Sequence, residues 1–177
     1  MPRLFTGLEL PPSVAAQLSL ARGGVIGARW LDPEDYHITL RFVGDVDARL
    51  AQDIAETLGE IRRPAANVRF EGLGWFGADR PRAIVARVKT DPALIDLQVE
   101  QERRLRRVGV APETRKFTPH VTLARLRGVG AKAVAEYLES RGGLAVEAFV
   151  AQRFVLYSAR EGSGGGPYVV EAAYPLV

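Results

Sequence analysis

The feature that most constrains this chain is a four-residue pattern, His-x-Thr-Leu, which occurs twice, at 37–40 and at 120–123. The chain has only two histidines, and each begins one copy of the pattern. The copies lie 83 residues apart, and the predicted strands that open at positions 3 and 82 lie 79 residues apart. This near agreement indicates an internal duplication in which each half contributes one copy.

The two halves share one order of predicted elements: strand, helix, motif-bearing strand, helix and strand. Apolar and β-branched runs favour strands, whereas apolar residues at spacings of three and four favour helices. In the first half, strands are predicted at 3–10, 36–44 and 67–76, and helices at 11–22 and 47–63. In the second half, strands are predicted at 82–88, 120–126 and 145–161, and helices at 91–110, with Asp91 as N-cap, and at 131–141.

A glycine-rich segment, GSGGGP at 162–167, follows the second half and predicts a loop before a last strand. The alternative is a phosphate-binding cradle, but no Gly-Lys-Ser/Thr follows it and the next element is a strand. We therefore predict one α+β domain over 1–177, with pseudo-repeats at about 3–75 and 82–157 and a C-terminal strand at 167–176.

Composition limits the functions open to the chain. With 177 residues, 47% of them hydrophobic, it can bury one sizeable core. The absence of cysteine excludes disulfides, thiol nucleophiles and thiolate metal sites. We find no signal-like or membrane-spanning stretch and expect a cytoplasmic monomer. The net charge of +3 and pI near 9.5 are compatible with an anionic partner such as nucleic acid.

The motif itself predicts paired polar groups on one surface. Side chains alternate along a strand, so His37 and Thr39 share one face, as do His120 and Thr122. Two imidazoles and two hydroxyls suit displacement at phosphorus, because one ring can accept a proton while the other donates one and the hydroxyls bind phosphate oxygens.

Two plainer interpretations remain open beside this one. A single strand histidine is more often packed or exposed than catalytic, although the repeat argues against this for both rings. A metal site is the other alternative, since carboxylates near the first motif could add a ligand to the histidines. These carboxylates are Asp32, Glu34, Asp35, Asp45 and Asp47.

The phrases "RWLDPEDYHITLRFVGDV" and "KFTPHVTLARL" resemble the 2H phosphoesterases, in particular the RNA 2′,3′-cyclic phosphodiesterases also named 2′-5′ RNA ligases. The resemblance implies a bilobal, pseudo-two-fold α+β fold, with two antiparallel sheets flanking a central cleft and the helices outside. It also implies a metal-independent enzyme without a cofactor. Members open a terminal 2′,3′-cyclic phosphate to a 2′-phosphomonoester, and some run the reverse reaction as ligases.

Carried over to this chain, the resemblance gives His37 the role of proton donor to the departing 3′-oxygen. It makes His120 the proton acceptor that activates water, while Thr39 and Thr122 hold the phosphate. Reversing the reaction exchanges the two histidine roles. The expected partner is an RNA or oligonucleotide that ends in a 2′,3′-cyclic phosphate.

Weaker candidates for the site follow the motif threonines in the sequence; they are Arg125, Arg41 and Phe42. Arg125 matches an arginine of the relatives and could bind phosphate, but strict alternation places it on the core face, whereas Arg41 has the parity of the motif. Phe42 matches an aromatic residue of the family and is a candidate for contacting the base, yet its parity favours a core role at least as much.

Other residues favour plainer roles. Trp30 is expected to pack rather than stack on a nucleotide. A basic run could guide RNA, although a solvated helix face explains at least half of it. Its members are Arg103, Arg104, Arg106 and Arg107, with Arg115 and Lys116 nearby. Rival functions are a catalytically silent RNA-binding module and a phosphodiesterase for another cyclic or 2′-5′ nucleotide.

Overall fold

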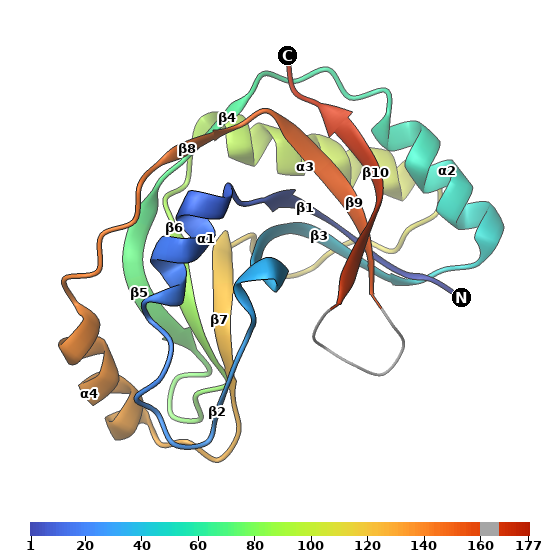
Figure 1. The fold of residues 1–177 in the computed structure, drawn as a ribbon. Helices are drawn as coiled ribbons and strands as arrows, with labels where there is room; N and C mark the ends of the chain where they lie inside the picture. The colour runs from blue at the N-terminus through green and yellow to red at the C-terminus, as the bar shows by residue number, and fades with distance from the viewer. Residues whose placement is uncertain (160–166) are drawn as a thin grey trace.

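The computed structural model describes residues 1–159 and 167–177, so the predicted glycine-rich loop lies outside the described residues except for Pro167. The described chain forms an arch of strands with helices around it (Figure 1). Its strands are β1 Arg3–Glu9, β2 Ala28–Trp30, β3 His37–Asp45, β4 Ala66–Val68, β5 Phe70–Phe76, β6 Ala83–Val88, β7 His120–Leu126, β8 Phe149–Ala151, β9 Arg153–Ala159 and β10 Tyr168–Pro175. Its helices are α1 Pro12–Ser19, α2 Ala48–Leu58, α3 Pro92–Arg107 and α4 Ala131–Arg141, with a 3₁₀ turn η1 at Pro33–Asp35.

The strands form two antiparallel halves that meet at one residue pair. The His37 lobe has the order β10-β9-β1-β3, and the His120 lobe continues as β7-β6-β5 with β2 also paired to β7. Between the lobes, the described pairing of β3 with β7 consists of Ile38 opposite Val121. The two motif strands therefore lie side by side where the lobes join.

Each predicted half gives its last strand to the other lobe. The predicted strand 67–76 divides into β4 and β5, and β5 pairs with β6. The predicted strand 145–161 divides into β8 and β9, and β9 pairs with β1. The short strands β4 and β8 pair with each other in a separate two-stranded sheet. This exchange ties the lobes together, because each lobe contains a strand from the other half of the sequence.

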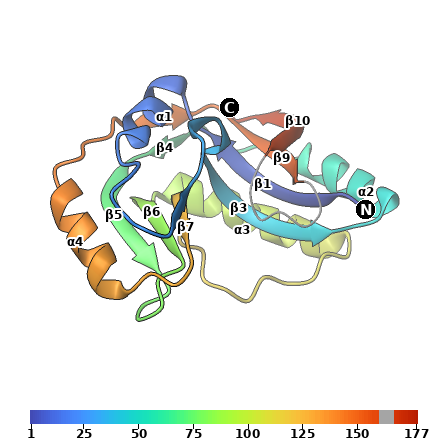
Figure 2. The same ribbon diagram turned by 60° about the horizontal axis from the view of Figure 1, so that its bottom comes forward.

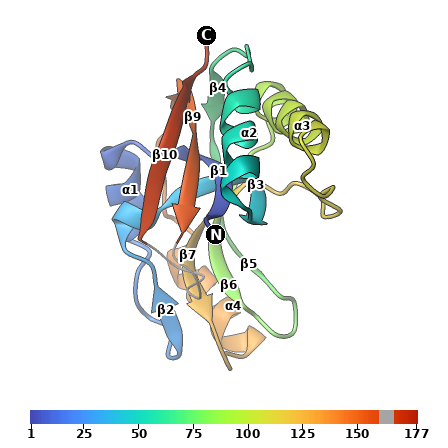
Figure 3. The same cartoon turned by 90° about the vertical axis from the view of Figure 1, so that its right-hand side faces the viewer.

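Helix positions follow from their caps and apolar faces. Asp91 caps α3 by accepting from the Ala93 N–H at 3.1 Å, as predicted, and Asp47 caps α2 by accepting from the Leu50 N–H at 2.8 Å. Helix α2 buries Ile54 and Leu58 in the main core and α3 buries three leucines there, and each such side chain contributes roughly 1.5–3 kcal/mol. Figure 3 shows α2 and α3 on one side of the molecule and α1 on the other.

The shorter elements complete the His120 lobe. Helix α4 lies beside β5 (Figure 2) and buries Val134 and Tyr137. Strand β2 and the turn η1 were not predicted, and they lead directly into the first motif. In the described part of the chain, every helix is too short or too polar to cross a membrane.

Candidate active site

The four motif side chains gather on one face of the sheet, called here the site face. Strands β3 and β7 begin at His37 and His120. Because Ile38 faces Val121 in an antiparallel pair, the register sets His37 opposite Thr122 and Thr39 opposite His120. Ile38 and Val121 themselves point into the main core, where both are fully buried.

The backbone holds both imidazoles in the same way. Each Nδ1 contacts the carbonyl oxygen two residues earlier: Asp35 O at 2.9 Å for His37 and Thr118 O at 2.7 Å for His120. A carbonyl only accepts, so Nδ1 carries the hydrogen in both rings and Nε2 is bare in the neutral form. In His37 this Nε2 accepts from the Thr39 hydroxyl at 3.0 Å. In both rings the nitrogen left without a hydrogen is thus Nε2.

Aromatic rings enclose His37. The ring centroids of Tyr168, Phe5 and Tyr157 lie 4.9, 5.0 and 5.5 Å from that of His37. Phe5, Tyr157 and Val155 form a small apolar cluster on the site face, separate from the main core. Burial lowers the pKa of His37 to about 4; the hydrogen bond to the Asp35 carbonyl opposes this change, and the charges of His120 and Arg125 reinforce it.

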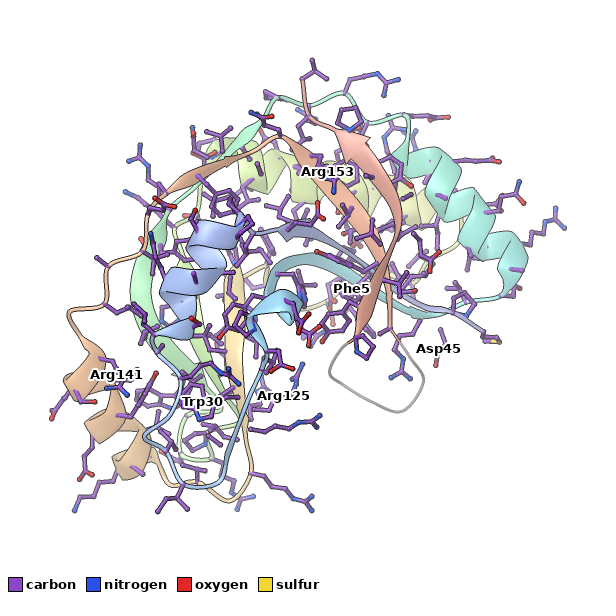
Figure 4. All side chains as sticks on the ribbon, in the orientation of Figure 1. Phe5, Trp30, Asp45, Arg125, Arg141 and Arg153 are labelled. Atoms are coloured by element: carbon purple, nitrogen blue, oxygen red, sulfur yellow. The ribbon has the colours of Figure 1, made fainter. Side chains whose placement is uncertain are left out.

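Arginines and one aromatic ring surround His120. The Phe76 ring meets His120 edge to face, with centroids 4.7 Å apart. Burial lowers the pKa of His120; the hydrogen bond to the Thr118 carbonyl opposes this, and the charges of Arg87 and Arg125 reinforce it. The charge of Arg125 thus affects both histidines, and Figure 4 shows this residue on the inner side of the arch.

A cavity of about 620 Å³ adjoins His37. Small side chains of α1, including Ala15, Ala16 and Ser19, line one side of it. Glu34 and Asp35 of η1 line another side, and the tyrosines next to His37 complete it. Burial, with the nearby charges of Asp32 and Glu34, raises the pKa of Asp35. The space can hold a group of nucleoside size whose polar edge donates hydrogen bonds.

A family comparison agrees with this geometry. The model of the family described as "LigT like Phosphoesterase" matches residues 8–85 and 88–168, and each stretch contains one motif. The chain belongs to the LigT-like phosphoesterase family.

Curated relatives of this LigT-like phosphoesterase are named RNA 2′,3′-cyclic phosphodiesterase. One from Aeropyrum pernix is 40% identical over 112 residues, which cover 62% of this chain and 63% of the relative. One from Thermotoga maritima is 31% identical over 134 residues, covering 71% of this chain and 70% of the relative. The chain spans less than two thirds of the A. pernix and Aquifex aeolicus relatives, 63% of each.

Solved structures share the fold. Escherichia coli LigT complexed with 3′-AMP matches with a TM-score of 0.77 and 22% identity, over 99% of each chain. A protein of Thermus thermophilus matches with a TM-score of 0.80 and 21% identity, over 98% of this chain and 97% of that one. These matches confirm the predicted α+β fold class with two antiparallel sheets.

Bulges in the LigT-like phosphoesterase overturn the strict alternation expected after each motif. The pairing of β1 with β3 skips Leu40, and the pairing of β6 with β7 skips Leu123. A bulged residue shifts the parity of all residues after it. Phe42, 44% exposed, and the exposed Arg125 therefore return to the side of the strand that carries the motif. The expectation that Arg125 lies on the core face was wrong, as was a core position for Phe42.

Arg41, a candidate for phosphate binding, lies on the opposite face. It is 4% exposed, and its guanidinium donates to Glu102 of α3, to the Phe42 carbonyl and to the Ala111 carbonyl at 2.6 Å. The bulge at Leu40 turns it away from the motif, so the parity argument that favoured it fails. Arg41 fastens β3 to α3 rather than facing the phosphate site.

The remaining predicted residues lie outside the site. Trp30 packs on the core with its ring 5.7 Å from that of Tyr137, as expected. In the basic run, Arg104 pairs with Glu100 and Glu60, and Arg106 with Glu102. Since α3 packs on the Arg41 side of β3, this run faces away from the motif. Among the described residues, no group of three or more His, Asp or Glu side chains is placed to hold a metal ion.

Sequence reasoning missed the immediate neighbours of both rings. Phe5, Phe76, Arg87 and the two tyrosines come from strands distant in the sequence, and no local pattern marks them. Arg87 is identified by the strand register, because it lies directly opposite His120 in the pairing of β6 with β7.

Proposed function

We propose that this LigT-like phosphoesterase hydrolyses RNA 2′,3′-cyclic phosphate ends to 2′-phosphomonoesters by a metal-independent, two-histidine mechanism. One observation supports it above the others. Two imidazoles at the lobe junction have the same tautomer, fixed by the same backbone contact, and both keep Nε2 as the reactive atom. The names of the curated relatives support the same substrate class.

The proposed steps move two protons. Water attacks phosphorus while His120 Nε2 takes its proton, and the bond between phosphorus and the 3′-oxygen breaks as His37 Nε2–H protonates that oxygen. The product carries a 2′-phosphate and a free 3′-hydroxyl. In the reverse direction the roles exchange: His37 takes the proton of the 3′-hydroxyl as the cyclic phosphate forms again, and His120 protonates the departing oxygen.

The proton on His37 must arrive with the substrate. Because burial lowers its pKa to about 4 in the free protein, the ring is neutral near pH 7. A bound phosphate anion favours the charged form of a nearby imidazole and raises its pKa. Substrate binding and protonation of His37 are therefore coupled, and binding strengthens as the pH falls from neutral.

The side chains around the two histidines orient the bound substrate. Thr39, Thr122 and Arg125 contribute donors to the phosphate oxygens on the site face. Phe42 offers an exposed ring for a base, and the cavity beside His37 has room for a nucleoside. An RNA terminus uses both kinds of surface, whereas an inorganic anion uses only the first.

The deciding experiment incubates the protein with an oligoribonucleotide ending in a 2′,3′-cyclic phosphate, with and without EDTA, and identifies the product isomer. We expect EDTA-resistant release of the 2′-phosphate, with His37→Ala and His120→Ala each slowing it at least ~10²-fold. Asn67→Ala, on the exposed side of β4, is the matched control and should keep full activity. A 3′-phosphate product, EDTA sensitivity, or tight binding without turnover would overturn the proposal, the last in favour of a silent RNA-binding module.

A further inference from the structure

Arg87 lies directly beside the second motif. It stands opposite His120 in the pairing of β6 with β7, so both side chains emerge on the site face (Figure 1 shows the three neighbouring strands). Its guanidinium reaches back over β5, where it lies 5.9 Å from the centre of the Phe76 ring. Phe76 in turn contacts His120. Arg87, Phe76 and His120 thus form a continuous chain of contacts.

A glycine on β5 makes room for this arrangement. A methyl group at Gly74 would lie 2.3 Å from Arg87 Nε and 2.6 Å from Nη2, closer than any real contact allows. The backbone at Gly74 does not have a left-handed φ, unlike Gly72 and Gly77, and the three atoms nearest to an added methyl group all belong to Arg87. Gly74 therefore serves to seat the guanidinium.

Among the described residues, no carboxylate offsets the charge of Arg87. Within 1–159 and 167–177, no Asp or Glu oxygen lies within ion-pair distance of this half-buried arginine. By contrast Glu9, which stands opposite His37 at the equivalent place on β1, is held by Arg153 through two hydrogen bonds of 2.7 and 3.0 Å. The charged groups that act on His120 are Arg87 from β6 and Arg125 from β7, and His120 interacts with His37 from β3.

We propose that Arg87 is a positioning residue for His120: seated across Gly74, it holds Phe76 against the imidazole and keeps a fixed positive charge beside it. The inference rests on the proposed function, in which His120 is the proton acceptor. A nearby cation keeps the ring free of a proton before substrate arrives, as an acceptor requires. When the ring takes its proton during reaction, the substrate phosphate offsets the repulsion.

The first test follows the histidine signals of the free protein by NMR as the pH is varied, since two histidines give two resolvable sets. Arg87→Gln should raise the pKa of His120, because it removes a positive neighbour, and should leave that of His37 nearly unchanged. Gly74→Ala should act in the same direction without any change in charge, because the methyl group displaces the guanidinium. Arg69→Gln, an exposed arginine before β5, is the charge-matched control and should leave both signals unmoved.

The second test separates positioning from substrate binding. With a 2′,3′-cyclic phosphate substrate, Arg87→Gln should lower kcat roughly tenfold with little change in KM, and Arg87→Lys should recover part of the loss. The acid limb of the kcat/KM profile should move to higher pH. An unmoved His120 pKa in both Arg87→Gln and Gly74→Ala, or a raised KM with unchanged kcat, would overturn the inference. The NMR result stands even if the protein proves inactive, so the two proposals fail independently.

Discussion

The two lobes have the same backbone arrangement around the motif histidine, but the side chains at equivalent positions differ. In both, Nδ1 of the motif histidine donates to a carbonyl two residues earlier, and in both the motif leucine forms a bulge. The side chains around them differ at equivalent places: Glu9 stands opposite His37 where Arg87 stands opposite His120. After the bulge, Phe42 returns to the site face in one lobe and Arg125 in the other.

This difference teaches that backbone and side chains control separate properties. The shared backbone contacts fix the same tautomer in both rings and leave both Nε2 atoms without a hydrogen in the neutral form. The side chains make the lobes unequal: one encloses its ring in Phe5, Tyr157 and Tyr168, and the other surrounds it with cations. Aromatic rings suit a nucleoside and cations suit phosphates, so under the proposed function we expect this asymmetry to orient an RNA end.

The largest loss of stability is expected at Arg41, the arginine that the bulge at Leu40 turns away from the site face. Arg41→Met should lower the free energy of unfolding by about 3 kcal/mol or more, because two carbonyls lose their donor and the part-buried Glu102 loses one of its two arginine partners. Arg125→Met, at an exposed arginine after the second bulge, should cost under about 1 kcal/mol. Urea unfolding followed by circular dichroism measures both. Equal losses would show that the bulges do not separate the two arginines.

Removing the motif hydroxyls tests whether the lobes share the phosphate equally. Thr39→Val and Thr122→Val should each lower kcat roughly 10²-fold, since each removes one donor to charge that develops on phosphate oxygens. The measurement is kcat on a cyclic-ended oligonucleotide, with Thr90→Val on an exposed loop as the control. A strong effect from only one threonine would place the phosphate in one lobe rather than between them.

As the pH falls, the His37 lobe should be the first part of the protein whose protonation lowers the free energy of unfolding. The folded pKa of His37 is about 4 and the ordinary value is 6.5, so between these pH values the unfolded chain binds a proton that the folded chain does not. Unfolding free energy should therefore fall as pH decreases through this window, by up to about 3 kcal/mol.

His37→Asn should flatten that dependence, and urea titrations at pH 4, 5, 6 and 7 measure the change. Glu102 acts in a lower window: burial tends to raise its pKa, but hydrogen bonds from Arg41, the Glu113 N–H and Arg106 lower it to about 2. Its contribution is lost only below about pH 4.5, the ordinary value of a glutamate. An unaltered slope in His37→Asn would mean that the aromatic rings do not exclude water from the imidazole.

Sequence reasoning reached the repeat, the motif strands and the capped helices, because each has a local signal. His37, Thr39, His120 and Thr122 follow from alternation over three residues, and Asp91 from its place before a proline. Alternation failed after Leu40 and Leu123, since a bulge depends on the partner strand and has no sequence signal of its own. The exchange of β5 and β9 was equally hidden, because pairing between distant strands is decided by packing.

The smallest effects should separate an aromatic from a cationic surface. Phe42→Ala should weaken binding of a cyclic-ended oligonucleotide by about 1–3 kcal/mol if a base stacks on it, with little change in salt dependence. Arg125→Gln should instead reduce the slope of log affinity against log salt by about 1, because one phosphate contact is lost. Titrations of a catalytically silent His120→Ala background with labelled RNA at several salt concentrations measure both. If the two variants change affinity and salt slope alike, the lobes do not divide base and phosphate between them, and the orientation of the RNA end has to come from the cavity beside His37.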